Sequence, residues 1–400
     1  MTNPDVVVIG AGVIGCSVAW HLATLGAGRV LVLERGQIGN GTSAMSSGIL
    51  RTHYSVPQNV DLALRSWRFF ERFAEHLDDP EASAGLVRCG YLIAVPEGDK
   101  VAPLRESLAA QAARGIAVEL LDARAAREKL PIARFDDAAL IGHEPDAGFA
   151  DATLTATSFA RAARRRGVVY REGVAATGLA IEGGRVRGVL THDSGAGVGG
   201  RIDAGMVVSA QNIWAHELTK WTGLPVPLVA ERHRVLALAG PAPYTRAMPV
   251  FKDLGSPGML YGRSYGGTQM LVSEGTAGEV LATPDTTQGE VSMDLVAHIG
   301  EQVAARFPGW EEAALASSWT GVYDVTPDWN PVLGPVPGLD GLIVAFGFSG
   351  HGFKLSPAVG RVLAQAALGL PTDVPLAPYA LERFAKGRML SGRYGAGAVS

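Results

Sequence analysis

The 400-residue sequence has little cysteine, little charge and no long apolar run. Its two cysteines, Cys16 and Cys89, are too few for a disulfide framework and favour a reducing compartment. The formal net charge of −4 gives no reason to expect nucleic acid or an anionic membrane as a partner. No segment approaches the roughly 20 consecutive apolar residues that span a bilayer, and the first residues lack the pattern of a signal peptide. We therefore expect a soluble protein of the cytoplasm.

Two kinds of catalytic site are also missing. No pair of histidine or cysteine residues has the spacing of metal ligands, so no metal site is predicted. No Gly-x-Ser-x-Gly motif is present, which argues against an α/β-hydrolase. What the chain does have is 51 glycines and 47% hydrophobic residues, without an internal repeat. This composition indicates a core large enough for two domains and many tight turns, some of them close to a ligand.

The beginning of the chain predicts a βαβ unit. Residues 6–9 (Val-Val-Val-Ile) and 30–33 (Val-Leu-Val-Leu) are continuous apolar runs, typical of strands buried on both faces of a parallel sheet. Residues 16–25 between them are expected to form a helix. Strand, helix and strand within about thirty residues make a right-handed βαβ unit.

The turn between the first strand and this helix has the dinucleotide-binding pattern G-x-G-x-x-G. Gly10 permits the tight turn, Gly12 lets the backbone approach a pyrophosphate, and Gly15 lets helix and strand pack closely. The helix directs its free N–H groups at the phosphates. Glu34 ends the second strand, about 20 residues further on, where a carboxylate accepts hydrogen bonds from a ribose. An acid there argues against a 2′-phosphate but does not separate NAD from FAD.

Strands of the same type return near the C-terminus. Residues 342–345 (Leu-Ile-Val-Ala) repeat the character of the first strand and precede Gly347 and a helix through Leu363. This arrangement predicts one discontinuous cofactor domain that holds a second domain in its insertions. The other predicted elements are helices at 60–78 and 154–166, strands at 89–95, 168–170, 206–208 and 270–272, and a hairpin loop at 195–200.

Further segments resemble the glycine/sarcosine oxidase family of flavoproteins, also called the D-amino-acid-oxidase-like family. Residues 39–43 (Gly-Asn-Gly-Thr-Ser), with 46–48 (Ser-Ser-Gly), are similar to that family's second FAD-contacting loop. Residues 347–354 (Gly-Phe-Ser-Gly-His-Gly-Phe-Lys) resemble its C-terminal flavin signature, and 326–328 (Thr-Pro-Asp) resemble the stretch before it. The resemblance covers nearly the whole chain.

The resemblance implies an α/β fold with a discontinuous, Rossmann-like FAD-binding domain. It also implies an inserted α+β substrate domain, whose mostly antiparallel sheet covers the flavin and forms the substrate pocket. We place the FAD-binding domain at residues 1–85, 150–222 and 320–400, and the substrate domain at 86–149 and 223–319.

The cofactor implied by the resemblance is FAD. A glycine turn before the C-terminal helix directs a second positive helix end at the ligand, which favours a reduced, negatively charged flavin. The predicted cofactor-binding residues are Gly10, Gly12, Val13, Ile14, Gly15, Glu34, Arg35, Gly41, Thr42, Ser43, Ser46, Ser47, Val174, Gly347, Phe348, Ser349, Gly350, His351, Gly352, Phe353 and Lys354.

The resemblance also implies four catalytic-site residues. Arg51 matches the position that holds the substrate carboxylate in sarcosine-oxidase-like enzymes, and Lys354 matches the second carboxylate-binding cation. Arginine offers a planar fork and lysine a point charge, although both residues could instead lie at the surface. Tyr261 matches an active-site tyrosine, the alternative being a packing role in its strand. His351 either contacts the flavin ring or caps its turn.

Other polar residues near these positions have open roles. His53, beside Arg51, is more often structural. His233 and Arg234 lie on a strand expected to line the pocket, without an assigned role. Asn212 stands where the family commonly has glycine, and asparagine tolerates a left-handed backbone, so the turn is expected to survive while its flavin contacts are in question.

Three further departures concern the redox chemistry. Gly321 replaces the cysteine through which some relatives attach the flavin, so we predict non-covalent FAD. Leu271 falls where a family lysine activates oxygen, and Gly275 falls where a nearby histidine is expected. Dehydrogenase behaviour is therefore favoured over oxidase behaviour. The alternative is that another cation, such as Arg263 or His233, reaches the same place.

These features predict an FAD-dependent enzyme that oxidises a C–N bond in a small amino acid or N-alkyl amino acid. The neutral amine would give a hydride to flavin N5, and the imine would then hydrolyse. Arg51 and Lys354 would lower the pKa of the amine, so no separate general base is expected. The alternatives are a non-catalytic or electron-relay subunit of a larger complex, and an oxidase of an unusual biosynthetic amine. The choice between oxygen and a carrier as electron acceptor stays open.

Overall fold

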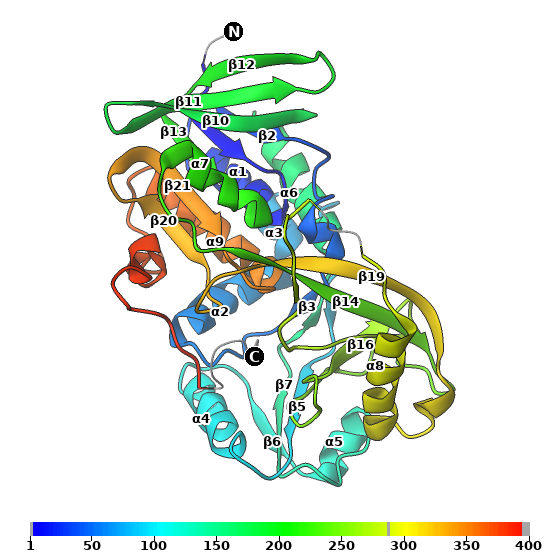
Figure 1. Ribbon diagram of the computed structural model, residues 1–400. Helices are drawn as coiled ribbons and strands as arrows, with labels where there is room; N and C mark the ends of the chain where they lie inside the picture. Colours follow the sequence, from blue (N-terminus) through cyan, green and yellow to red (C-terminus); the bar gives the residue numbers. More distant parts are fainter. Residues whose placement is uncertain (1–2, 286–288, 394–400) are drawn as a thin grey trace.

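The computed structural model describes residues 3–285 and 289–393. Two large sheets dominate its architecture (Figure 1). One lies at the top of the view and combines blue, green and orange strands, which come from distant parts of the chain. The other occupies the lower half, in cyan, green and yellow.

The first sheet contains the predicted βαβ unit. Its strand order is β10-β11-β21-β13-β1-β2-β9, with β12 beside β11 and β20 beside β21, and its central strands are parallel. Strand β1 is buried along its whole length, because the sheet has neighbours on both faces. The strands of this sheet are β1 (Val6–Ile9), β2 (Val30–Glu34), β9 (Val169–Glu172), β10 (Val174–Glu182), β11 (Arg185–Asp193), β12 (Val198–Asp203), β13 (Met206–Ser209), β20 (Val332–Val336) and β21 (Leu339–Phe346).

The second sheet is mostly antiparallel, with order β18-β14-β17-β16-β15-β5-β7-β6 and β19 beside β14. Among the described strands of this second sheet, only β15 and β5 pair in parallel. Its strands are β5 (Tyr91–Val95), β6 (Glu119–Leu121), β7 (Leu140–Glu144), β14 (Val229–Ala239), β15 (Val250–Asp253), β16 (Tyr261–Tyr265), β17 (Gln269–Ser273), β18 (Glu279–Val280) and β19 (Ala314–Val325). The predicted α/β fold with a mostly antiparallel second sheet is confirmed.

A small third sheet and the helices complete the fold. The third sheet has the order β3-β8-β4 and consists of β3 (Ile49–Leu50), β4 (Val87–Arg88) and β8 (Gly148–Phe149). The α-helices are α1 (Val13–Thr24), α2 (Pro57–Glu71), α3 (Phe73–Leu77), α4 (Val101–Ala112), α5 (Ala123–Lys129), α6 (Ala152–Arg165), α7 (Glu217–Thr222), α8 (Met293–Arg306) and α9 (Gly352–Ala367).

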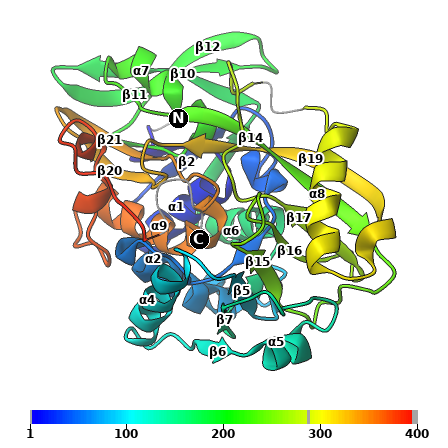
Figure 2. The ribbon, with the colours of Figure 1, turned by 60° about the horizontal axis from the view of Figure 1, so that its bottom comes forward.

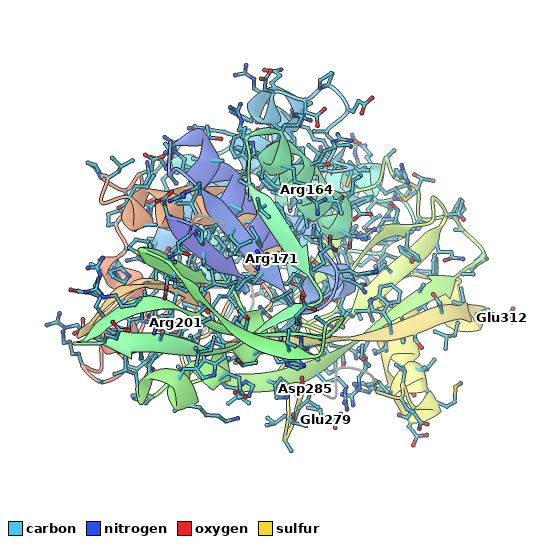
Figure 3. The ribbon with its side chains drawn as sticks, turned by 90° about the horizontal axis from the view of Figure 1, so that it is seen from above. Arg164, Arg171, Arg201, Glu279, Asp285 and Glu312 are labelled. Carbon is cyan, nitrogen blue, oxygen red and sulfur yellow. The ribbon has the colours of Figure 1, made fainter. Side chains whose placement is uncertain are left out.

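The two large sheets draw on alternating parts of the chain. The first sheet uses strands between 6 and 34, 169 and 209, and 332 and 346, whereas the second uses strands between 91 and 144 and between 229 and 325. Strand β19 crosses the predicted domain boundary at 320. It pairs with β14 along its whole length, and the two strands run across the molecule (Figure 3). In that view Arg201 of β12 and Glu312, just before β19, lie on opposite sides.

Helices from the two ends of the chain pack directly against each other. Figure 2 shows α1 in blue beside α9 in orange. A Cβ at Gly360 would lie 2.1 Å from Ser17 Oγ, so glycine allows this close approach. Among the described residues, none of the helices combines the length and the apolar character needed to cross a bilayer.

Most predicted elements differ from the observed ones by a few residues at their ends, and three of these differences have a local cause. The helix predicted at 60–78 is two helices, α2 and α3, because the backbone at Arg72 leaves the helical region with φ −123°. The strand predicted from Cys89 begins at Tyr91, after Gly90 with φ 84°. The loop predicted at 195–200 ends earlier, since β12 already begins at Val198 and pairs with β11 as a hairpin.

Candidate active site

The glycine turn before α1 has the conformation that the fingerprint predicts. Gly10 has a φ of 98°, and a Cβ there would lie 2.6 Å from the Ala210 carbonyl oxygen. A Cβ on Gly15 would lie 1.9 Å from the Gly10 carbonyl oxygen, so both positions require glycine. Gly12 begins α1 without a side-chain cap, whereas Asp151 caps α6 with its carboxylate. The start of α1 therefore presents backbone N–H groups and a positive helix end to a ligand.

Glu34 holds the other side of this turn. Its carboxylate accepts hydrogen bonds from the backbone nitrogens of Ala11, at 2.8 Å, and Gly36, at 2.7 Å. Beside it, the Arg35 guanidinium lies 3.9 Å from the centre of the Trp214 ring. These groups border a first cavity at the ends of β1 and β2. The first cavity is lined by Ile9, Gly10, Gly12, Leu33, Glu34, Arg35, Gly36, Gln37, Asn40, Gly41, Thr42, Ser43, Met45, Ala175, Ala176, Thr177, Ala210, Gln211, Asn212, Trp214, His216, Glu217, Trp221 and Asp285.

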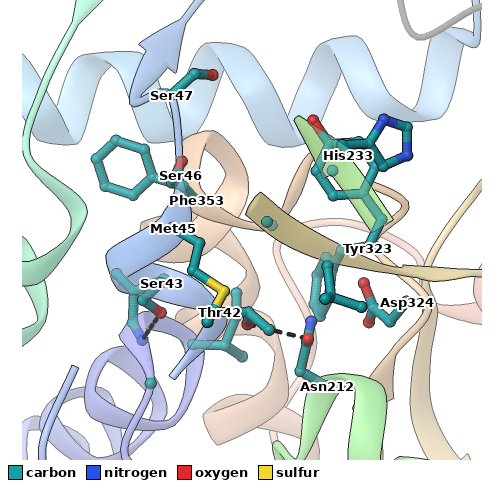
Figure 4. A pocket seen from close by; sticks show the side chains of 18 of the residues that line it. Thr42, Ser43, Met45, Ser46, Ser47, Asn212, His233, Tyr323, Asp324 and Phe353 are labelled. Atoms are coloured by element: carbon teal, nitrogen blue, oxygen red, sulfur yellow. Dashed lines mark hydrogen bonds between the residues drawn. The ribbon is translucent and has the colours of Figure 1, made fainter. Parts of the chain in front are cut away.

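The loop that resembles an FAD-contacting segment packs against α1 and the residue-212 turn. Ser43 Oγ accepts a hydrogen bond from the Val13 backbone nitrogen at 3.0 Å (Figure 4). Thr42 Oγ1 donates to Asn212 Oδ1, also at 3.0 Å. Asn212 has φ 51°, so the left-handed turn survives the loss of glycine, as predicted.

The C-terminal signature forms a second tight turn, ahead of α9. Ser349 has φ 49° and Gly350 has φ 84°. A Cβ on Gly350 would lie 2.5 Å from the Tyr323 ring, so the glycine makes room for that ring. Asp324 Oδ2 accepts a hydrogen bond from the Gly347 backbone nitrogen at 2.6 Å. Burial raises the pKa of Asp324 to about 6.

A second cavity lies between the loop and the signature, and it shares Gly12, Thr42 and Ser43 with the first. Figure 4 shows Ser43 and Met45 on one side of this cavity and His233 and Tyr323 on the other. The second cavity is lined by Gly12, Val13, Ile14, Thr42, Ser43, Met45, Ser46, Ser47, Ala210, Asn212, His233, Val235, Tyr261, Gly321, Val322, Tyr323, Asp324, Phe348, Gly350, Gly352 and Phe353.

The shape and donors of these two cavities fit FAD. The two cavities adjoin, and together they run from the Glu34 carboxylate to the C-terminal signature. The starts of α1 and α9 border them, and neither helix is capped by the side chain of its own N-cap residue, although Ser43 accepts from the Val13 N–H of α1. Free helix N-termini suit a pyrophosphate at one point and a negatively charged ring at another. Most of the predicted cofactor-binding residues line one of these cavities.

A third cavity adjoins the second and contains three of the four predicted catalytic-site residues. Arg51, Lys354 and Tyr261 come together there, although they are far apart in the sequence. Arg51 and Lys354 are buried, which overturns the alternative that they are surface residues. The third cavity is lined by Ser47, Ile49, Arg51, Tyr91, His233, Lys252, Tyr261, Glu274, Gly275, Tyr323, Gly350 and Lys354.

The backbone that carries Arg51 is held by a buried carboxylate. Glu144, at the end of β7, accepts hydrogen bonds from the Thr52 backbone nitrogen at 2.6 Å, Thr52 Oγ1 at 2.7 Å and the His53 backbone nitrogen at 3.0 Å. Arg51 Nη1 donates to the His53 carbonyl oxygen, and its guanidinium lies 4.7 Å from the centre of the Tyr54 ring. Burial raises the pKa of Glu144 to about 7. Glu144 could not be identified from the sequence, because β7 and residue 51 meet only in the fold.

Three other predicted residues have surroundings that bear on their roles. His53 Nδ1 lies 2.8 Å from Gln111 Nε2 in a buried contact, which agrees with the structural role. The His351 ring packs against Tyr54, with 5.1 Å between centroids, while its neighbour Gly350 lines the cavities. Val174 lies in the hydrophobic core next to Ala175, which lines the first cavity. Contact of His351 or Val174 with the cofactor stays a prediction.

Two further residues of the third cavity had no predicted role. Lys252 comes from β15 and is 2% exposed. Tyr323 of β19 stacks on His233 of β14, with ring centroids 3.9 Å apart. Burial lowers the pKa of His233 to about 4, so this ring is neutral at pH 7. In the sequence Lys252 stands between Phe251 and Asp253 at the end of β15, and this pattern does not mark a polar site.

Among residues 3–285 and 289–393, no group of three or more histidine, cysteine or acidic side chains is placed to hold a metal ion. The charged side chains that line the third cavity are Arg51, Lys252, Lys354 and Glu274. Burial, with the nearby charge of Arg51, lowers the pKa of Lys354 well below its usual range.

Comparisons with known proteins identify the family to which this chain is similar. The family model described as "FAD dependent oxidoreductase" (DAO) matches residues 5–366. "Sarcosine oxidase subunit beta" from Arthrobacter sp is 28% identical over 99% of this chain and 94% of that protein. The crystal structure of glycine oxidase from Geobacillus kaustophilus has a TM-score of 0.80 at 26% identity and covers 96% of this chain and 99% of that one.

The fold is matched further by the crystal structure of L-proline dehydrogenase from P. horikoshii. Its TM-score is 0.87 at 24% identity, over 97% of this chain and 99% of that chain. The family match spans both glycine turns, the loop at 39–48 and both large sheets. The chain therefore belongs to the DAO family of FAD-dependent oxidoreductases and is a flavin-dependent enzyme.

Proposed function

We propose that this enzyme oxidises the C–N bond of a small amino acid or N-alkyl amino acid. The observation that carries the proposal is the meeting of Arg51 and Lys354 in the buried third cavity, next to the second cavity that fits the flavin. Two buried cations at one point suit a carboxylate, because an anion offsets the cost of burying them. Relatives named for sarcosine and glycine support an amino-acid substrate.

The chain's own residues would bind and orient this substrate. The Arg51 fork would hold the carboxylate through two N–H groups, and Lys354 would add a point charge. Tyr261, on β16, lines both cavities and would lie beside the bound amine. When bound, FAD supplies the acceptor for the hydride of the C–H bond next to nitrogen.

The electrostatics of the cavity favour the neutral form of the amine. Arg51, Lys354 and Lys252 surround the site with positive charge, which lowers the pKa of a bound ammonium group. His233 is neutral at pH 7 and lines the same cavity, but a proton transfer by His233 is not required, because the amine is already neutral. The imine product would hydrolyse in water after release.

The test is anaerobic reduction of the FAD-loaded protein by a panel of amino acids and N-methyl amino acids. Bleaching of the yellow flavin by at least one carboxylate-bearing amine is expected. A decarboxylated analogue of that amine serves as the matched control and should bleach the flavin far more slowly. If no amine in the panel bleaches the flavin, while dithionite does, the proposal is wrong.

A second candidate is a subunit that relays electrons within a larger complex, since one similar protein is named as a subunit. An electron relay has no need of the carboxylate clamp, by which we mean the buried pair of cations Arg51 and Lys354. Anaerobic bleaching of the flavin by a substrate, in the purified single chain, would favour the enzyme over the electron-relay subunit.

A further inference from the structure

The third cavity contains a cation beyond the predicted clamp. Lys252 lies on β15, directly opposite Tyr261 of β16 in the antiparallel register. Its side chain is almost fully buried, and its Nζ donates a hydrogen bond to the Met259 carbonyl oxygen at 2.9 Å. Nζ also lies 5.4 Å from the centre of the Tyr261 ring. The lysine thus approaches the cavity from a different strand of the sheet than the tyrosine.

Gly275 makes room for this ammonium group. A Cβ at position 275 would lie 2.1 Å from Lys252 Nζ, which is closer than any real contact. Gly275 lines the same cavity. The ammonium group therefore fills the space where a side chain at position 275 would begin.

Three basic side chains, Arg51, Lys252 and Lys354, line the third cavity together with one carboxylate, that of Glu274. Within the described part of the chain, neither Lys252 nor Lys354 forms an ion pair with a carboxylate. Asp253, the neighbour of Lys252, is paired instead with Arg306 at 3.0 Å. Glu274 also lines the cavity, and its Oε1 accepts a hydrogen bond from Gln302 Nε2 at 2.7 Å and lies 3.3 Å from His298 Nε2.

The consequence is mutual repulsion between the basic side chains of the third cavity. Burial, together with the nearby charge of Arg51, lowers the pKa of Lys252 to about 7. One substrate carboxylate offsets a single positive charge. A ligand with a second anionic group would offset one more, and it would favour the charged form of both lysines.

We propose that the substrate is an amino acid or N-alkyl amino acid with a second carboxylate, and that Lys252 binds this second carboxylate. The proposal rests on the proposed function, since the first carboxylate is assigned to Arg51 and Lys354. Lys252 is then a specificity-determining residue, which separates dicarboxylic from monocarboxylic amines.

The experiment compares two ethers that cannot form an imine, methoxyacetate and diglycolate, which differ by one carboxylate. Their binding to the FAD-loaded protein is measured from the perturbation of the flavin absorption spectrum. We expect diglycolate to bind at least about tenfold more tightly than methoxyacetate. In Lys252→Met this preference should disappear, while the affinity for methoxyacetate stays within about twofold.

Lys100→Met is the matched control. Lys100 also lies close enough to Lys252 to affect its pKa, but its Nζ donates to the Leu254 carbonyl oxygen and it does not line the third cavity. Its variant should keep the preference for diglycolate. If Lys252→Met does not retain FAD, Gly275→Ala provides the test, because the added methyl group displaces the ammonium group without removing its charge. That variant should lose most of the preference.

Equal binding of the two ethers by the native protein would overturn the inference. An unchanged preference for diglycolate in Lys252→Met would also overturn it. An equal loss of affinity for both ethers in that variant would overturn it too, because it would place Lys252 at the first carboxylate. The proposed function fails separately, if no amine reduces the flavin. If monocarboxylic amino acids reduce it as quickly as dicarboxylic ones, only the inference about Lys252 fails.

Discussion

Arg263 of β16 lies directly opposite Leu271 of β17 in the antiparallel register. Directly opposed residues point to the same face of a sheet, so the guanidinium group is a close neighbour of the leucine. Arg263 Nε donates to the Ser47 carbonyl oxygen at 2.6 Å, and Nη1 donates to the Ser264 carbonyl oxygen at 2.7 Å. Burial lowers the pKa of Arg263 to about 10, which leaves it charged at pH 7. The lysine expected in an oxidase is absent, but a charge lies beside its position.

We still expect slow reaction with oxygen. The Arg263 guanidinium is fixed by two carbonyl oxygens, while Leu271 itself is fully buried and offers no charge to developing superoxide. The measurement is to reduce the flavin anaerobically with substrate and to mix it with air-saturated buffer. Slow reoxidation, with brisk turnover on an artificial acceptor dye, is the expected result.

Two variants determine which residue controls this rate. Leu271→Lys should speed reoxidation, because it places a charge at the predicted position. Arg263→Met should leave the slow rate unchanged. Reoxidation of the native protein as fast as in an ordinary amine oxidase, with stoichiometric peroxide, would contradict the prediction. If that fast reoxidation were then lost in Arg263→Met, the arginine would be the residue that activates oxygen.

The carboxylate clamp predicts a loss of binding when either cation is removed. Arg51→Ala and Lys354→Ala should each weaken binding of a carboxylate-bearing substrate by roughly 2–5 kcal/mol, because both side chains are desolvated. FAD content should change little. Arg65→Ala removes a half-exposed guanidinium outside the cavities and serves as the control. Normal flavin reduction by the best substrate in both clamp variants would show that the clamp is assigned wrongly.

FAD should be held without a covalent bond. Gly321 lines the second cavity where some relatives have the cysteine that attaches the flavin, and it offers no nucleophile. Acid precipitation of the protein should release the yellow colour into the supernatant. Colour that stays with the pellet would be evidence of a covalent link.

The raised pKa of Glu144 predicts how the free energy of unfolding depends on pH. Burial raises its pKa from the ordinary 4.5 to about 7, so the folded protein binds this proton more tightly than the unfolded chain. The stability it contributes is complete below about pH 4.5 and is lost as pH rises through about 7, a change of up to about 3 kcal/mol. Comparison of thermal midpoints at pH 5 and pH 8 should show a larger fall for the native protein than for Glu144→Gln. Parallel pH profiles in the two proteins would refute this assignment.

The fold was predictable where short segments carry their own signal. The run at 6–9 and the glycines that follow determine a buried strand, a tight turn and a helix within the same unit, and all three are found. The break between α2 and α3 at Arg72 was not predictable, because the apolar periodicity continues through it. The extension of β19 across residue 320 depends on its pairing with β14, which is distant in the sequence.

The site was predictable where a motif carries it. Arg51 and Lys354 lie next to segments that resemble a known loop and signature, and both reach the third cavity. Lys252, Glu144 and Tyr323 were missed, because each lies on a strand of the second sheet and meets the cavity or its supports only through long-range pairing. No local spacing relates these three residues to the glycine turns.

The contact between Lys252 and Gly275 links a residue of β15 to a residue of the loop that follows β17. Because the ammonium group fills the space of a side chain at 275, neither position is free to vary alone. A related protein with a histidine or any other side chain at 275 cannot keep a lysine at 252 in this rotamer. The two positions should therefore covary among relatives, and a lysine together with a glycine at this pair would serve as a sequence marker for enzymes that share this cavity.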